Sequence, residues 1–118
     1  MSQLNERISF LKYEAGGIFE RHRDGVFVYH EDKRSFITIL IYLNGDYTDG
    51  RTKVFTDDLS FEFAVVPTPG LAVSMTQRVL HEGGIVTEGL KYVIRIDAIY
   101  EREGVYDKEK LEKNQLAE

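Results

Sequence analysis

Residues 35–43 read SFITILIYL, and this is the most apolar stretch of the chain. Periodicity alone does not separate a buried strand from a buried helix here. The short length, the β-branched residues and the Asn44-Gly45-Asp46 turn that follows all favour a strand. Successive side chains of a strand point to opposite faces. One face is purely aliphatic and is expected to join the core; it carries Ile37, Ile39, Ile41 and Leu43. The other face can line a cavity; it carries Phe36, Thr38, Leu40 and Tyr42.

Strand signals recur on both sides of this stretch. They cover residues 7–13, 18–24, 26–29, 52–55, 60–66, 71–75 and 91–100. Turn residues separate them about every ten positions, which is typical of an all-β sandwich or barrel. We predict one domain over residues 1–118, with a β core at about 7–102 and a short polar helix or tail at 103–118.

Composition excludes several classes of function. The net charge is −5, from 15 basic and 20 acidic residues, so nucleic acid is not an expected partner. Without cysteine, the chain has no disulfide framework, zinc–thiolate site or thiol nucleophile. No apolar run approaches the ~18 residues of a membrane span, and the first residues lack a signal-peptide pattern. We therefore expect a cytoplasmic protein that does not associate with membranes.

A histidine and a carboxylate lie two residues apart in the predicted strand at 18–24. His22 and Asp24 would share one face of it, with Ile18 and Glu20, while Phe19 would point to the other. They would supply two ligands of a 2-His-1-carboxylate Fe(II) site, and His81 is the best candidate for the third. Taken singly, these residues also fit a solvated strand face and a loop histidine.

A lysine that follows His81 in the sequence is a candidate partner for an anionic ligand. Lys91 comes ten residues later, and Gly83, Gly84 and Gly89 lie between them. If Lys91 points into a barrel, it needs an anion, because an unpaired buried charge is costly. An anionic cosubstrate that chelates the metal at one end could pair with Lys91 at the other. Arg95 would share the face of Lys91, although both could instead be solvent-facing charges.

Ordered motifs from residue 7 to 102 resemble the Fe(II)/2-oxoglutarate-dependent dioxygenases, in particular the prolyl 4-hydroxylase-like branch. Residues 13–25 resemble Y-x-x-G-x-x-F-x-x-H-x-D-G, and residues 34–44 resemble R-x-x-x-T-x-L-x-Y-L-N. Residues 67–70 resemble P-x-x-G. Residues 80–83 resemble L-H-E-G, and residues 89–97 resemble G-x-K-Y-V-x-R-x-D. The ordered set is far more specific than the His22–Asp24 pair alone.

The resemblance implies a double-stranded β-helix, or jelly roll, with Fe(II) bound by the catalytic triad His22, Asp24 and His81. It implies a hydroxylase that uses 2-oxoglutarate and O2, releases succinate and CO2, and acts on a prolyl or other amino-acid side chain. The substrate would be a peptide or a small molecule. The residues implied to hold 2-oxoglutarate are Lys91, Tyr13, Thr38 and Tyr42, and Arg95 is a candidate substrate contact.

Some positions depart from the family pattern. Residues 49–52 read DGRT where the family usually has G-G-E-T, and Met75 stands where an aromatic residue is common. Many members carry a helical layer before the first matched strand, and this chain starts almost at that strand. We expect either a minimal or truncated domain, or self-association in which another subunit covers the exposed face of the sheet. The alternative function is a non-catalytic, cupin-like jelly roll that binds a small anion or a protein partner.

Overall fold

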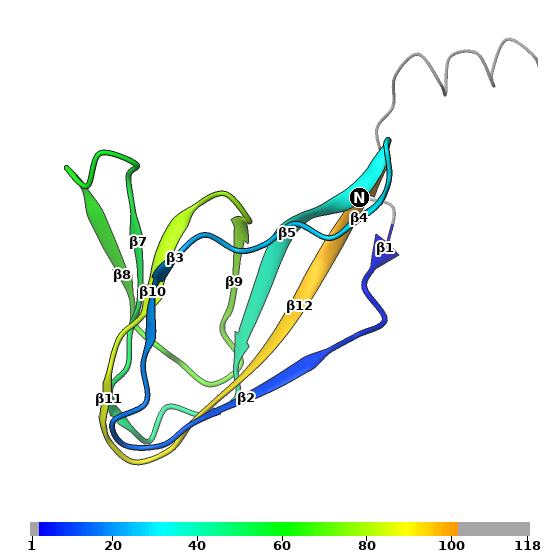
Figure 1. The fold of residues 1–118 in the computed structure, drawn as a ribbon. Coiled ribbons are helices and arrows are strands. Elements are labelled where there is room, and N and C mark those ends of the chain that lie inside the picture. Colours follow the sequence, from blue (N-terminus) through cyan, green and yellow to red (C-terminus); the bar gives the residue numbers. More distant parts are fainter. Residues whose placement is uncertain (1–2, 102–118) are drawn as a thin grey trace, which may run out of the picture.

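The computed structural model describes residues 3–101, which fold into two antiparallel sheets that face one another (Figure 1). All regular elements in this range are strands, so the prediction of an all-β fold is confirmed. The strands are β1 (Gln3–Leu4), β2 (Ser9–Tyr13), β3 (Phe19–His22), β4 (Val28–His30), β5 (Lys33–Tyr42), β6 (Thr48–Asp49), β7 (Thr52–Phe55), β8 (Glu62–Val65), β9 (Ala72–Thr76), β10 (Leu80–Gly83), β11 (Val86–Glu88) and β12 (Lys91–Glu101).

The larger sheet is built around β5 and β12, its two longest strands. They pair from Val93–Tyr42 to Glu101–Lys33, with an irregularity between Ala98 and Ile99. Strands β1 and β2 pair with β12, and strands β4 and β9 pair with β5. The apolar stretch at 35–43 is therefore a central strand, as its β-branched residues indicated.

The smaller sheet has the order β3-β10-β7-β8, and β6 pairs with β11 in a separate ribbon. In Figure 1 the two sheets converge at the bottom of the view and diverge toward the top. Apolar side chains fill the space between them, in a cluster of Tyr42, Val65 and Val93 that Leu11, Tyr13, Leu40 and Val73 extend. This arrangement of two facing antiparallel sheets is the predicted jelly roll.

The two faces of β5 differ from expectation in their burial. Thr38 and Tyr42 are fully buried, whereas Ile37, Ile39 and Ile41 are only half-buried. Thr38 and Tyr42 face the smaller sheet, and the isoleucines lie on the outer face of the larger sheet. The prediction that the aliphatic face forms the core is therefore wrong for the described residues, because the smaller sheet packs against the other face.

Several predicted boundaries also change. Strand β3 ends at His22, so Asp24 lies just beyond it rather than within the predicted strand at 18–24, and His81 lies in β10. The predicted helix or tail at 103–118 lies outside the described residues. No helix in residues 3–101 is long and apolar enough to cross a membrane.

Candidate metal centre

The two histidines of the predicted triad lie side by side on neighbouring strands. His22 of β3 pairs directly with His81 of β10, and the centroids of their rings are 4.3 Å apart. Asp24 reaches the same point from the segment that follows β3. Its Oδ1 lies 3.2 Å from His22 Nε2 and 3.5 Å from His81 Nε2. One ligand atom from each residue fits within 4.8 Å of the others.

Backbone carbonyls set the orientation of both imidazole rings. His22 Nδ1 donates to the Glu20 carbonyl oxygen at 2.6 Å, and His81 Nδ1 donates to the Val79 carbonyl oxygen at 2.9 Å. A carbonyl oxygen can only accept, so both Nδ1 atoms carry protons and the two Nε2 atoms face the centre. Such a contact on the outer nitrogen is the usual support of a metal-binding histidine.

The donor set fits a ferrous ion. Two imidazole nitrogens and one carboxylate oxygen converge on one point, which is the ligand set of non-haem Fe(II) oxygenases. His22 Nε2 and Asp24 Oδ1 also lie within hydrogen-bond distance of each other. Among the described residues, the nearest cationic group to Asp24 Oδ1 outside the histidines is Arg95 Nη1, at 3.8 Å. That distance is too long for a hydrogen bond, so Arg95 does not occupy the Asp24 oxygen that faces the histidines.

Lys91 is a buried cation on the same cavity. Its side chain is 3% exposed, and Nζ donates to the Gly50 carbonyl oxygen at 2.7 Å. The ring centroids of Tyr13 and Tyr42 lie 5.1 and 5.9 Å from Nζ. No carboxylate within residues 3–101 forms an ion pair with it, and burial lowers the pKa of Lys91 to about 8. The carboxylate of a bound ligand would supply the missing negative charge.

All eight residues predicted for the site line one cavity of about 50 Å³ between the sheets: Tyr13, His22, Asp24, Thr38, Tyr42, His81, Lys91 and Arg95. In this structure the Tyr42 hydroxyl is hydrogen-bonded to Thr52, and the Thr38 hydroxyl donates to Asp24 Oδ2 at 2.7 Å. Burial raises the pKa values of Tyr13 and Tyr42, which keeps both phenols protonated. Each phenol therefore carries one proton that it can donate.

Sequence reasoning missed Phe19 and Thr52 in the cavity wall. Phe19 was predicted to face away from His22, yet their ring centroids are 4.1 Å apart. The pairing shifts between His81–His22 and Gly83–Phe19, and this β-bulge turns Phe19 to the inner side. Thr52 could have been found, since it keeps the threonine of the family's G-G-E-T pattern.

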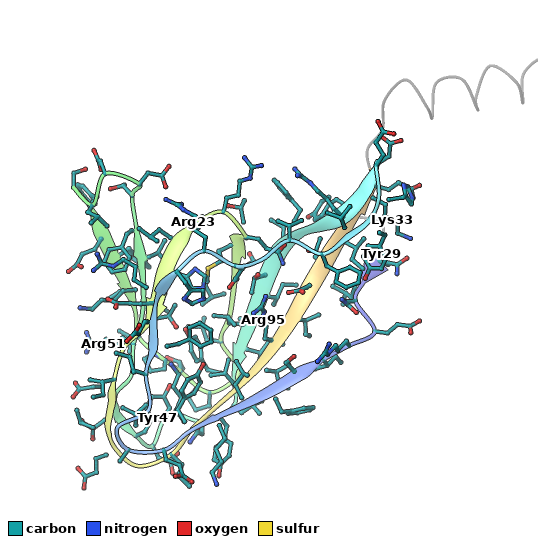
Figure 2. The ribbon with its side chains drawn as sticks, in the orientation of Figure 1. Arg23, Tyr29, Lys33, Tyr47, Arg51 and Arg95 are labelled. Atoms are coloured by element: carbon teal, nitrogen blue, oxygen red, sulfur yellow. The ribbon has the colours of Figure 1, made fainter. Side chains whose placement is uncertain are left out.

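Arg95 joins the cavity to a larger open groove. It points into the space between the sheets (Figure 2) and lines both the cavity and a groove of about 690 Å³. Phe27 and Tyr29, whose ring centroids are 4.7 Å apart, form part of the groove wall. Asp97 lies next to Arg95 there, with its Oδ1 3.4 Å from Arg95 Nε. Arg95 is thus placed between the metal centre and bulk solvent.

Comparisons with known proteins agree with this geometry. Residues 8–96 match the sequence profile of the family described as the 2OG-Fe(II) oxygenase superfamily. A prolyl-4-hydroxylase from Pseudomonas putida is 23% identical over 81% of this chain and 52% of its own, with a TM-score of 0.63. A viral collagen prolyl hydroxylase from Paramecium Bursaria Chlorella virus-1 is 18% identical over 87% of this chain and 63% of its own, with a TM-score of 0.65. At these identities the two structures establish the shared fold, and this chain spans between half and two thirds of their length. No curated protein sequence matches the chain.

Proposed function

The chain belongs to the 2OG-Fe(II) oxygenase superfamily, and we propose that it hydroxylates an unactivated C–H bond of a prolyl or other amino-acid side chain. The superfamily uses Fe(II), 2-oxoglutarate and O2. One observation carries the proposal for this chain: the His22–Asp24–His81 centre opens into the same cavity as the buried Lys91, for which residues 3–101 provide no carboxylate partner.

The two ends of the cavity would bind different groups. His22, Asp24 and His81 would hold the metal, and Lys91 would pair with the carboxylate of 2-oxoglutarate that does not chelate it. When bound, Fe(II) and 2-oxoglutarate supply the oxidising chemistry, in which one atom of O2 enters the new hydroxyl group and the other enters succinate as CO2 leaves. The protein orients these groups and limits access of water.

The groove beside Arg95 supports a substrate that approaches from solvent. It is more than ten times as large as the metal cavity by volume and meets it at Arg95. Its wall combines the aromatic Phe27 and Tyr29 with polar groups that include Asn5 and Ser9. Such a mixed surface suits an amino-acid side chain and its amide groups. We propose that Arg95 contacts the substrate at this junction.

The test begins with anaerobic spectroscopy. Fe(II) is added to the protein without oxygen, followed by 2-oxoglutarate, and the visible absorption spectrum is recorded. Bidentate chelation of Fe(II) by 2-oxoglutarate should give a weak charge-transfer band that is absent from Asp24→Ala. The matched control is Asp57→Ala, because Asp57 is an exposed carboxylate that pairs with Arg23; this variant should retain the band. A folded parent protein without the band would contradict the proposal and favour the binding-module alternative.

The substrate class needs a second experiment. The protein is incubated aerobically with Fe(II), 2-oxoglutarate and a proline-containing peptide library, and the peptides are analysed by mass spectrometry. Gain of one oxygen atom on proline, in step with succinate release, would support prolyl hydroxylation. Gain on another residue would move the substrate to that side chain. Turnover of 2-oxoglutarate without oxygen transfer to any peptide would contradict an amino-acid side chain in peptides as the substrate.

A further inference from the structure

A buried polar cluster surrounds Asp24 on the side away from the histidines. Ser35 and Thr38 of β5 are fully buried, and Gln77, which follows β9, is 1% exposed. Buried hydroxyl and amide groups carry a desolvation cost, so they persist where they form hydrogen bonds. In this cluster the bonds converge on the segment that carries Asp24.

The contact from Thr38 fixes the Asp24 carboxylate. Thr38 Oγ1 donates to Asp24 Oδ2 at 2.7 Å, and the Asp24 side chain is only 3% exposed. This bond occupies Oδ2 and directs Oδ1 toward the two Nε2 atoms. A threonine hydroxyl has a single proton to donate. While that proton is on Asp24, Thr38 has none to donate to 2-oxoglutarate.

The Asp24 backbone is held in the same way. Because Asp24 lies beyond the end of β3, it lacks the ladder hydrogen bonds of that strand. Its amide instead donates to the Gln77 carbonyl oxygen at 3.0 Å. The Gln77 side chain accepts from Ser35 Oγ at 2.7 Å.

Ser35 also forms hydrogen bonds to Phe27, in the segment that follows Asp24. Its Oγ accepts from the Phe27 amide at 2.7 Å, and its own amide donates to the Phe27 carbonyl oxygen at 2.9 Å. Both sides of the metal-binding segment are therefore anchored to β5 and to the turn after β9.

We propose that Thr38 is a positioning residue for the metal ligand Asp24, and that the buried Ser35–Gln77 pair holds the Asp24 segment in place. This assigns Thr38 to the metal rather than to 2-oxoglutarate, the role that the family resemblance implied. The inference rests on the proposed function, because it takes His22, Asp24 and His81 as the metal ligands. Loss of a partner that orients a ligand costs about 10- to 100-fold in metal affinity.

Metal affinity tests the role without turnover. Mn(II), an air-stable divalent probe, is titrated against the parent and Thr38→Val by calorimetry. We expect Thr38→Val to bind Mn(II) about 10- to 100-fold more weakly, and Thr38→Ser, which keeps the hydroxyl, to restore most of the affinity. The matched control is Thr87→Val, because the exposed Thr87 donates to Asp49 Oδ2 at 2.8 Å outside the cavity. That variant should bind Mn(II) like the parent.

The outcomes distinguish a failure of the Thr38 assignment from a failure of the proposed function. If Thr38→Val binds Mn(II) like the parent but requires more 2-oxoglutarate for the charge-transfer band, Thr38 is a cosubstrate contact and the inference is overturned. If the parent itself binds no Mn(II) and shows no band, the proposed function is wrong, and the role of Thr38, which depends on it, is wrong as well. Should Thr38→Val not fold, Thr38→Ala removes the same donor without placing a methyl group against the carboxylate, and the same affinity loss is expected.

Discussion

Replacing Lys91 with methionine should stabilise the ligand-free protein and remove its ability to bind 2-oxoglutarate tightly. Lys91 is 3% exposed and has no carboxylate partner among the described residues. Burial lowers its pKa from 10.5 to about 8, because the low dielectric disfavours the charged form. The folded protein therefore bears the cost of a desolvated ammonium group until an anion arrives.

The size of the effect follows from the pKa difference. A change from 10.5 to about 8 corresponds to about 3 kcal/mol in free energy of unfolding. Methionine has a similar length and no charge, but it leaves the Gly50 carbonyl oxygen without its donor, which offsets about 1–2 kcal/mol. We expect Lys91→Met to gain about 1–2 kcal/mol at pH 7.

The pH dependence has a defined sign. Between about pH 8 and pH 10.5 the unfolded chain holds the Lys91 proton while the folded protein has lost it, so the free energy of unfolding of the parent rises with pH in this window. The advantage of Lys91→Met is largest below pH 8 and disappears toward pH 10.5.

Urea unfolding at pH 7 and at pH 10, followed by circular dichroism, measures both effects. Lys12→Met is the matched control, because the Lys12 side chain is 52% exposed and forms an ion pair with the exposed Glu14; the stability of this variant should change little. In a thermal melt with Mn(II), 2-oxoglutarate should raise the melting temperature of the parent and not that of Lys91→Met. A variant that is less stable than the parent at pH 7, or a stability difference that does not depend on pH, would refute this reasoning.

Three further predictions concern the cavity. His22→Ala and His81→Ala should each abolish the rise in melting temperature that Mn(II) produces, whereas His30→Ala, outside the cavity, should retain it in the same thermal assay. Thr52→Val leaves the buried Tyr42 hydroxyl unpaired and should cost about 1–3 kcal/mol in urea unfolding; an unchanged midpoint would mean that water replaces the bond. Gly83→Ala places a Cβ 3.3 Å from Phe19 Cβ and 3.9 Å from Lys91 Nζ. It should raise the 2-oxoglutarate concentration needed for the charge-transfer band while Mn(II) affinity holds, and a loss of both would point to a distorted β10.

The outer face of the larger sheet shows where sequence periodicity stops being informative. Alternation correctly separated Ile37, Ile39 and Ile41 from Thr38 and Tyr42, because a strand places successive side chains on opposite faces. It could not rank the two faces by burial. That ranking depends on which face the smaller sheet covers, and this is a property of the whole fold.

At the metal centre, too, the sequence predicted some features and the tertiary structure decided others. The order of motifs along the chain was enough to identify the fold, the family and a set of residues that the structure brings into one cavity. This worked because metal ligands and a buried cation need particular residue types, and those types are visible in the sequence. The β-bulge that turns Phe19 inward depends on register between two strands, so no pattern within β3 could show it.

The partner of each hydroxyl was also decided only by tertiary structure. The sequence by itself determined that Thr38 and Tyr42 share a face of β5, and it predicted that this face can line a cavity. Folding then placed Asp24 within 2.7 Å of the Thr38 hydroxyl and Thr52 against Tyr42. A hydrogen bond is set by tenths of an ångström between atoms far apart in the chain, whereas sequence spacing specifies only which side of a strand a residue occupies.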